Sequence, residues 1–399
     1  MKVAVVKERR AHERRVAASP DTIKRMIAMG LEVVAESGAG EGAGFTDAAF
    51  AAAGATIAAD PASTLGDADI VLKVQRPQTQ TSGEGAVDEL KCMKRDAVLI
   101  GLLQPVQNPA EIEAYAGAGI TAFAMELLPR ITRAQAMDVL SSQGNLAGYK
   151  AAIDAADEFG RAFPMMMTAA GTIKAARVLV MGAGVAGLQA IATARRLGAI
   201  VSATDVRAAA KEQVESLGAT FVQVDDEAAR SAETAQGYAR EMSENYQRRQ
   251  RERITEALKR TDVVICTALI PGRRAPILLT EAMVAELAPG SVVVDLAIEA
   301  GGNVEGGRPG EIVTTANGVK IIGHVNMPSR IAADASQLYA RNLLSFLTLL
   351  VDKDGRLVID ADDEIIKSTL LTRDGVVVNP PLAISPAAEA ASPASAPDD

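Results

Sequence analysis

The stretch Arg177-Val-Leu-Val-Met-Gly-Ala-Gly-Val-Ala-Gly187 decides the fold of the second half of this chain. A short apolar run leads directly into the pattern Gly-x-Gly-x-x-Gly, and a helical pattern begins at Val185. This order brings backbone N–H groups and the positive end of a helix to a position where a diphosphate can bind. We therefore expect Gly182, Gly184 and Gly187 to form the dinucleotide loop of a doubly wound α/β domain.

An acidic residue stands where such a domain selects its dinucleotide. Asp205 follows the apolar run Ile200–Thr204, about 20 residues after Gly184. A carboxylate at this point accepts hydrogen bonds from ribose hydroxyls and repels a 2′-phosphate, which favours NAD(H) over NADP(H). Arg207 could favour the phosphate instead, but the carboxylate at the strand tip is the closer determinant.

A second glycine-rich stretch competes for the same role. It runs from Gly38 to Gly44, after the apolar run Leu31–Ala35. Thr46 stands at an N-cap position, where its hydroxyl accepts the N–H that a phosphate would use, and Glu41 adds a negative charge. We interpret this stretch as a structural turn.

Both halves of the chain alternate short apolar runs with helical patterns, which is typical of parallel sheets covered by helices. In the first half we expect strands near Val3–Val6, Leu31–Ala35, Ala55–Ala58, Ile70–Val74, Ala97–Leu102 and Ile120–Met125. In the second half we expect them at Val178–Met181, Ile200–Thr204, Thr220–Val224, Val263–Ala268, Val292–Leu296 and Val319–Ile322. The pattern predicts an α/β protein with two doubly wound Rossmann-like domains joined by long helices.

The domain boundaries follow from the connecting segments. A long helical pattern from about Ala134 to Ala162 links the two series, and a second one covers Leu338–Leu350 before a hairpin at Asp374-Gly375. We expect a discontinuous first domain (residues 1–135 plus 330–379), an NAD(H)-binding domain (136–329) and a disordered Pro/Ala-rich tail (380–399). The charged excursion Asp225–Arg260 is either a solvated helical insertion or a flap over a ligand.

Composition excludes several classes of function. The 399 residues carry a net charge of −9 with 3% aromatic residues, which argues against a nucleic-acid surface. Two cysteines and two histidines cannot build a recognisable metal site, and no apolar run is long enough to span a bilayer. The charged N-terminal stretch does not resemble a secretory signal, so we expect no metal and a cytoplasmic chain.

Two further stretches carry a specific resemblance. They are Met125-Glu-Leu-Leu-Pro-Arg-Ile-Thr-Arg-Ala-Gln-Ala-Met-Asp-Val-Leu-Ser-Ser-Gln-Gly-Asn-Leu-Ala-Gly-Tyr149 and Phe163-Pro-Met-Met-Met-Thr-Ala-Ala-Gly-Thr172. With the glycine loop, they resemble the NAD(H)-binding component, domain I, of proton-translocating NAD(P) transhydrogenase, which is related to alanine dehydrogenase. The resemblance extends from residue 1 to about residue 379.

The resemblance implies a set of site residues. The loop that would hold the nicotinamide ring, and with it the catalytic role, contains Arg130, Ile131, Thr132, Gln135, Asp138 and Ser141. The other implied nucleotide contacts are Ala183, Gly184 and Val185 at the diphosphate, Asp205, Val206 and Arg207 at the ribose, and Gly237, Tyr238, Gln250 and Leu269 around a mobile loop. From the residues alone, Arg130 and Asp138 could equally form an ion pair at a helix start.

The resemblance also implies partners: a homodimer, the NADP(H)-binding domain of a beta subunit, and transmembrane alpha and beta subunits that would hold the chain at the inner (plasma) membrane. Hydride passes directly between two nicotinamide C4 atoms, so no side chain has to move a proton.

Two alternatives stay open. The first is an alanine dehydrogenase-like enzyme, in which Arg15 and Lys73 would bind a keto acid, although no acid/base histidine lies between His12 and His324. The second is a non-catalytic NAD-sensing module.

Overall fold

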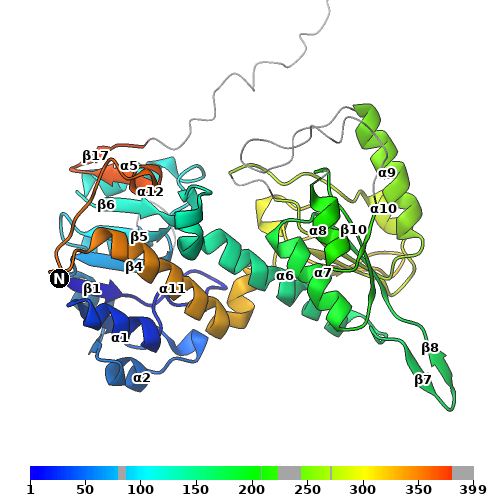
Figure 1. Cartoon of the computed structure of the whole chain (residues 1–399), viewed down its shortest axis with the longest axis horizontal. Coiled ribbons are helices and arrows are strands. Elements are labelled where there is room, and N and C mark those ends of the chain that lie inside the picture. Colours follow the sequence, from blue (N-terminus) through cyan, green and yellow to red (C-terminus); the bar gives the residue numbers. More distant parts are fainter. Residues whose placement is uncertain (80–86, 208, 223–243, 270–271, 380–399) are drawn as a thin grey trace, which may run out of the picture.

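The computed structural model describes residues 1–79, 87–207, 209–222, 244–269 and 272–379. Two α/β domains lie side by side, and a long helix runs between them (Figure 1). Each strand that the apolar runs predict is present, so the predicted fold class is confirmed. None of the described helices is long and apolar enough to cross a membrane.

The first domain is built on an eight-stranded sheet in the order β17-β16-β6-β5-β4-β1-β2-β3. Its strands are β1 (Lys2–Val5), β2 (Glu32–Glu36), β3 (Thr56–Ala58), β4 (Ile70–Gln75), β5 (Val98–Leu102), β6 (Thr121–Ala124), β16 (Leu370–Arg373) and β17 (Val376–Val377). Its helices are α1 (Pro20–Ala28), α2 (Asp47–Ala52), α3 (Pro61–Leu65), α4 (Glu89–Cys92), α5 (Pro109–Gly117), α11 (Ala332–Leu350) and α12 (Glu364–Thr369). The first six strands are parallel, and β16 pairs antiparallel with β6.

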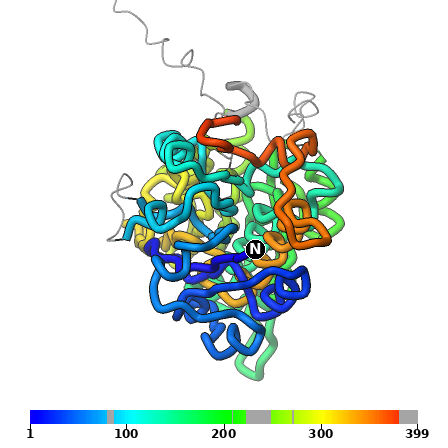
Figure 2. The backbone as a smooth tube through the Cα atoms, turned by 90° about the vertical axis from the view of Figure 1, so that its left-hand side faces the viewer, coloured from blue at the N-terminus to red at the C-terminus, as the bar shows by residue number. Residues whose placement is uncertain are grey.

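Residues from the end of the chain complete this first domain. Helix α11 packs into its core, where the Phe346 ring meets the Phe123 ring edge-on with 5.4 Å between centroids. The Tyr339 hydroxyl donates to the backbone oxygen of Lys73 at 2.8 Å. Figure 2 shows this returning segment beside the N-terminal part of the chain. The hairpin predicted at Asp374-Gly375 is confirmed by the pairing of β16 with β17.

The second domain contains a seven-stranded sheet in the order β11-β10-β9-β12-β13-β15-β14. The strands are β9 (Arg177–Met181), β10 (Ile200–Thr204), β11 (Thr220–Phe221), β12 (Val263–Cys266), β13 (Val292–Asp295), β14 (Ile312–Thr314) and β15 (Lys320–Ile322), with helices α7 (Val185–Arg196), α8 (Ala210–Ser216), α9 (Glu244–Leu258) and α10 (Glu281–Ala285). The strand order reverses between β9 and β12, which is where doubly wound sheets bind their ligands. The antiparallel edge strand β14 was not predicted.

Helix α6 (Val139–Glu158) joins the two domains and packs along α7. The two backbones cross closely, because a Cβ on Gly148 would lie 1.9 Å from the backbone oxygen of Ala186. The predicted start of this helix at about Ala134 is wrong. Thr132–Met137 instead forms a 3₁₀ segment, and the helix begins after Asp138, whose carboxylate accepts the N–H of Ser141 at 2.9 Å.

A short hairpin projects from the second domain. It consists of β7 (Met166–Thr168) and β8 (Gly171–Ile173), and Figure 1 shows it extending away from both sheets. Residues 164–174 are all exposed. Sequence patterns do not reveal this hairpin, because its exposed methionines do not alternate with polar residues.

Candidate functional site

The glycine loop follows β9 and opens α7 as predicted, and its three glycines have different roles. Gly182 has φ +102°, in the left-handed region that favours glycine. A Cβ on Gly184 would meet nothing within 4 Å, so a ligand can approach this backbone. Gly184 is the N-cap of α7 and has no side chain to accept the first N–H groups of the helix, which leaves them available to an anion.

Gly187 allows the helix to pack against the loop, with help from a residue that the sequence motifs did not reveal. A Cβ on Gly187 would lie 1.8 Å from the backbone oxygen of Gly182. Thr267, directly after β12, donates its hydroxyl to the same Gly182 oxygen at 3.0 Å and its N–H to the Met181 oxygen at 2.8 Å. Thr267 therefore supports the glycine loop from the neighbouring strand. Its signal was its position at the end of the strand that pairs with β9.

Asp205 lies beside the glycine loop at the tip of β10. It accepts the N–H of Ala183 at 2.7 Å, and Arg207 donates to it from its backbone at 2.8 Å and from its side chain at 2.9 Å. Burial alone would raise the pKa of Asp205, but the guanidinium of Arg207 and the backbone N–H groups hold it below its ordinary value. The carboxylate is therefore ionised and fixed at the loop. Val206 between them is half-buried.

The predicted nicotinamide loop extends from the end of β6 to the start of α6. Arg130, Thr132 and Gln135 are exposed, and Ile131 is half-buried. Asp138 and Ser141 are brought together, since the Ser141 hydroxyl and N–H both donate to the Asp138 carboxylate. A two-point ion pair from Arg133 to Asp363, at 2.6 and 2.9 Å, anchors the loop to α12.

Glu126 begins this loop and was not predicted as a site residue. Its Oε1 accepts the N–H of Gln104, which follows β5 with φ +50°, while its Oε2 is inaccessible and has no hydrogen-bond partner among the described residues. Burial raises the pKa of Glu126 to about 7, although the backbone N–H groups that it accepts oppose this rise. A carboxyl that is half protonated near neutral pH therefore lies four residues before Arg130.

The two domains contact each other beside this loop. A Cβ on Gly272, in the segment after β12, would lie 3.5 Å from the Val106 side chain of the first domain. Leu269 in the same segment is 49% exposed, and Gln250 on α9 is half-buried. Gly237 and Tyr238 lie outside the described residues. The carboxyl ends of β5 and β6 therefore lie near the segment that follows β12.

The basic residues Arg15 and Lys73 are both buried and matched by carboxylates. Arg15 donates to Glu13 at 2.6 and 2.8 Å, and burial of Glu13 is outweighed by Arg15, which lowers its pKa to about 2. Lys73 lies 2.9 Å from Glu89 and 3.5 Å from Glu8. A keto acid would have to compete with these internal carboxylates.

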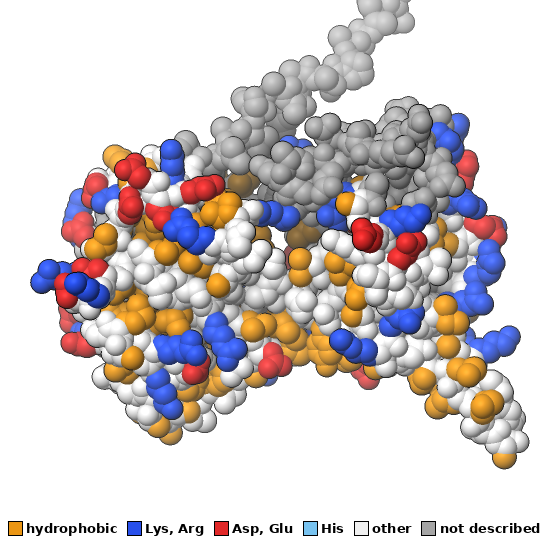
Figure 3. Space-filling model, in the orientation of Figure 1, with side chains coloured by type: hydrophobic (Ala, Val, Ile, Leu, Met, Phe, Trp, Pro, Cys, Tyr) orange, Lys and Arg blue, Asp and Glu red, His pale blue; other side chains and the backbone are white. Residues whose placement is uncertain are grey.

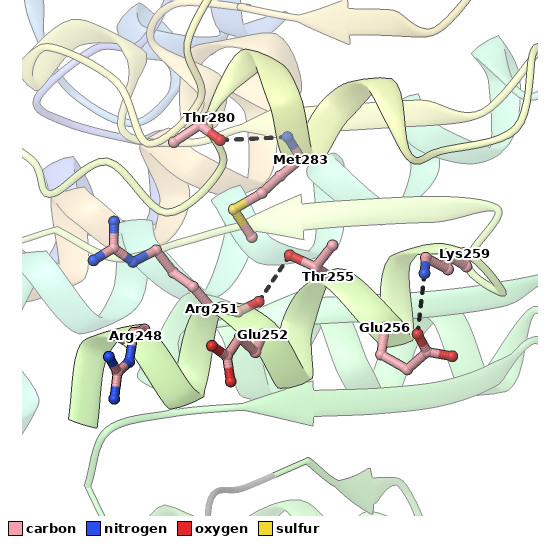
Figure 4. Close-up of a pocket in the computed structure, with 8 residues that line it drawn as sticks. All are labelled: Arg248, Arg251, Glu252, Thr255, Glu256, Lys259, Thr280 and Met283. Atoms are coloured by element: carbon pink, nitrogen blue, oxygen red, sulfur yellow. Dashed lines mark hydrogen bonds and ion pairs between the residues drawn. The ribbon is translucent and has the colours of Figure 1, made fainter. Parts of the chain in front are cut away.

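Two other candidate sites do not belong to the nucleotide site. At the competing glycine stretch, the Thr46 hydroxyl accepts the N–H of Ala49 at 3.1 Å and caps α2. A groove of about 390 Å³ lies between α9 and α10, and none of its lining residues comes from the glycine loop or the nicotinamide loop (Figure 4). It is lined by Arg248, Arg251, Glu252, Thr255, Glu256, Lys259, Thr280 and Met283. Among the described residues, no group of three or more potential ligands could hold a metal ion.

Comparison with known proteins places this geometry in a family. The model "Alanine dehydrogenase/PNT, N-terminal domain" matches residues 4–147, and "Alanine dehydrogenase/PNT, C-terminal domain" matches residues 151–380. The chain belongs to the alanine dehydrogenase/PNT family. The boundary between the two matches falls inside α6.

Within the alanine dehydrogenase/PNT family, the similarity is graded. The chain is 58% identical to the first of the alpha-subunit polypeptides of the Rhodospirillum rubrum NAD(P) transhydrogenase, over 96% of its length and 99% of the relative. It is 31% identical to an alanine dehydrogenase of Halomonas elongata, over 94% of both chains. A transhydrogenase crystal structure from Sinorhizobium meliloti superposes with a TM-score of 0.85 at 50% identity, covering 95% of this chain and all of the other. Alanine dehydrogenase is thus the more distant relative.

The close approach at Gly187 gives a first prediction. Gly187→Ala would drive a methyl group into the Gly182 oxygen, so we expect NADH affinity to fall at least tenfold, with a stability loss of about 1–3 kcal/mol. Isothermal titration and urea unfolding measure both quantities. The control is Gly117→Ala in α5, where a Cβ meets nothing within 4 Å. Equal NADH affinity in the two variants would contradict the role assigned to Gly187.

Glu126 gives a prediction about pH. The folded protein retains a proton that the unfolded chain releases above about pH 4.5, so the unfolding free energy falls as pH rises from 4.5 to about 7. Glu126→Gln removes this loss and should be less sensitive to pH over that window by up to about 3 kcal/mol.

Urea unfolding at pH 5 and pH 8 tests this difference. The similarly raised pKa of Glu8 affects both proteins equally and cancels. Glu113→Gln, at an exposed position on α5, is the control and should follow the wild type. Parallel pH profiles for wild type and Glu126→Gln would exclude a proton on Glu126.

Proposed function

We propose that this chain is the NAD(H)-binding component of a proton-translocating NAD(P) transhydrogenase. The carrying observation is the open glycine loop with an ionised Asp205 at its side. Its fit to a dinucleotide is supported by the free space at Gly184 and the uncapped start of α7. The high identity to a transhydrogenase alpha subunit, against lower identity to alanine dehydrogenase, supports the same choice.

In this proposal the chain contributes position rather than proton transfer. Bound NADH supplies a hydride at its nicotinamide C4, and NADP bound on a partner subunit receives it. Asp205, Val206 and Arg207 hold the ribose, while Gly182, Ala183, Gly184, Val185 and Gly187 hold the diphosphate. Positioning alone supplies a large share of rate enhancement when reacting atoms are held about 3–3.5 Å apart.

The loop from Arg130 to Ser141 would orient the nicotinamide. The Ser141 hydroxyl donates its proton to Asp138, so its remaining lone pairs can accept an N–H from the carboxamide. Gln135 is exposed and can both donate to and accept from the same amide. Arg130, Ile131 and Thr132 precede the 3₁₀ turn and complete the proposed contact surface. Gly237, Tyr238, Gln250 and Leu269 are proposed contacts from the other domain.

The proposed partners follow from the same assignment. The chain would meet the NADP(H)-binding domain of a beta subunit and be held at the inner membrane, on its cytoplasmic side, by transmembrane alpha and beta subunits. Proton passage would belong to those subunits. The relative from Rhodospirillum rubrum is itself named as one portion of a subunit, which supports a multi-subunit enzyme.

A homodimer is supported by the projecting hairpin. Met165, Met167 and Ile173 are 61%, 79% and 39% exposed, and Figure 3 shows hydrophobic side chains along this projection at the lower right. A two-stranded hairpin is marginally stable by itself, and exposed apolar surface of this kind marks an interface. We propose that a second copy of this chain covers it.

The alternatives make different predictions in one assay. NADH should bind at least tenfold more tightly than NADPH, and the chain mixed with an NADP-binding partner domain should reduce an NADP analogue in stopped flow. Reduction of pyruvate with ammonium by the chain alone would indicate an alanine dehydrogenase. Nucleotide binding with neither activity would indicate a sensor, and a preference for NADPH would contradict the proposal.

The hairpin gives a separate prediction. Met167→Asp places a charge at the centre of the proposed dimer contact, so we expect the dissociation constant of the dimer to rise at least tenfold, as measured by sedimentation equilibrium. Val376→Asp is the control, because Val376 is similarly exposed at 56% but lies on β17 of the first domain. If both variants sediment as the wild type does, the hairpin is not the contact.

A further inference from the structure

The segment from Ala268 to Pro276 connects the two domains at the proposed nucleotide site. It leaves β12 after Thr267, carries the proposed contact Leu269, and brings Gly272 to Val106 of the first domain. Residues 270 and 271 lie outside the described residues. Leu269 is half exposed, so its position depends on what holds the two ends of the segment rather than on its own burial.

Both ends are held by one side chain. The Asn303 amide nitrogen donates to the backbone oxygens of Ala268 and Pro276, each at 2.8 Å. Its amide oxygen accepts the Ala268 N–H at 3.1 Å. Asn303 is fully buried, so each of these hydrogen bonds replaces one that water would otherwise make. The amide therefore fixes the separation of the two ends.

Asn303 is itself rigidly placed. Its N–H donates to Asp295 at 2.8 Å, and its backbone oxygen accepts from Leu278 at 2.8 Å and Leu279 at 3.0 Å. Asp295, at the end of β13, is fully buried and also accepts the N–H groups of Ala297 and Val304. A continuous chain of hydrogen bonds thus connects the central sheet to the segment that reaches the first domain.

We propose that Asn303 is a positioning residue for nucleotide binding: by holding Ala268 and Pro276 together, it sets where Leu269 meets the nucleotide and where Gly272 meets Val106. The proposal rests on the proposed function, because it assumes that NADH binds in this cleft. Asparagine is suited to the task since it donates twice and accepts once at the same place. Serine or aspartate cannot make all three hydrogen bonds.

Asn303→Asp tests the role while conserving side-chain shape. Its carboxylate cannot donate to both carbonyls, so we expect NADH to bind about tenfold to a hundredfold more weakly. The hydride-transfer rate at saturating NADH, measured with the NADP-binding partner, should change much less than the dissociation constant. Amide hydrogen exchange should accelerate in residues 267–279 and not across the rest of the second domain.

The matched control is Asn317→Asp. The Asn317 amide also donates to main-chain oxygens, among them that of Leu287 at 3.2 Å, but it lies just before β15, at the opposite edge of the same sheet. We expect NADH affinity within twofold of wild type in this variant. Equal affinities in the two variants, or exchange that accelerates uniformly in Asn303→Asp, would overturn the proposal.

Two further measurements keep the test decisive. If Asn303→Asp does not fold, Asn303→Ser should weaken NADH binding in the same way, and unchanged affinity in that variant would overturn the inference. In the wild type, the Ala268 amide should exchange slowly and slow further with NADH, while rapid exchange would also overturn it. A wild-type chain that fails to bind NADH contradicts the proposed function itself.

Discussion

The nucleotide site depends on one steric constraint: the space that a side chain at residue 187 would need is filled by the backbone oxygen of Gly182. Because α7 can approach β9 this closely, its N-terminus points over the carboxyl ends of β9 and β12. Thr267 donates to the same oxygen, so the turn, the helix and the neighbouring strand meet at one carbonyl. The open backbone at Gly184 is a consequence of this packing.

Only one of the two sheets has an open crevice at the point where its strand order reverses. In the first domain the reversal lies between β1 and β4, and Lys73 on β4 lies there in a buried group with Glu8 and Glu89. Arg15 and Glu13 form a second buried pair, which also accepts a hydrogen bond from Asn326 at 2.9 Å. Internal charges thus fill the first crevice, while the second has glycine backbone available to a ligand.

The sequence predicts those features that local chemistry determines. Ser19 and Pro20 mark the start of α1, and Thr46 caps α2, because capping is a matter of a few adjacent residues. The glycine spacing and Asp205 likewise follow from one strand, one turn and one helix. The nicotinamide loop could be located only through resemblance, since its residues are mostly exposed and have no diagnostic spacing.

The remaining features depend on contacts between distant segments. Thr267 and Asn303 become part of the site only when β12 and β13 lie beside β9, and neither has a motif of its own. Glu126 was overlooked because nothing in its sequence neighbourhood shows that its carboxyl is buried. The start of α6 was placed too early because alanine-rich sequence continues a helical pattern through the 3₁₀ turn, whereas the Asp138 cap decides the boundary.

The return of α11 and β16 to the first sheet has a consequence for synthesis on the ribosome. The N-terminal strands emerge first, yet Phe123 lacks Phe346 and the edge of β6 lacks β16 until the last portion of the chain has been translated. At about 5–20 residues per second, that interval is roughly 10–50 s. The second domain, whose strands are contiguous in sequence, can be complete while the first still exposes apolar surface to chaperones and proteases.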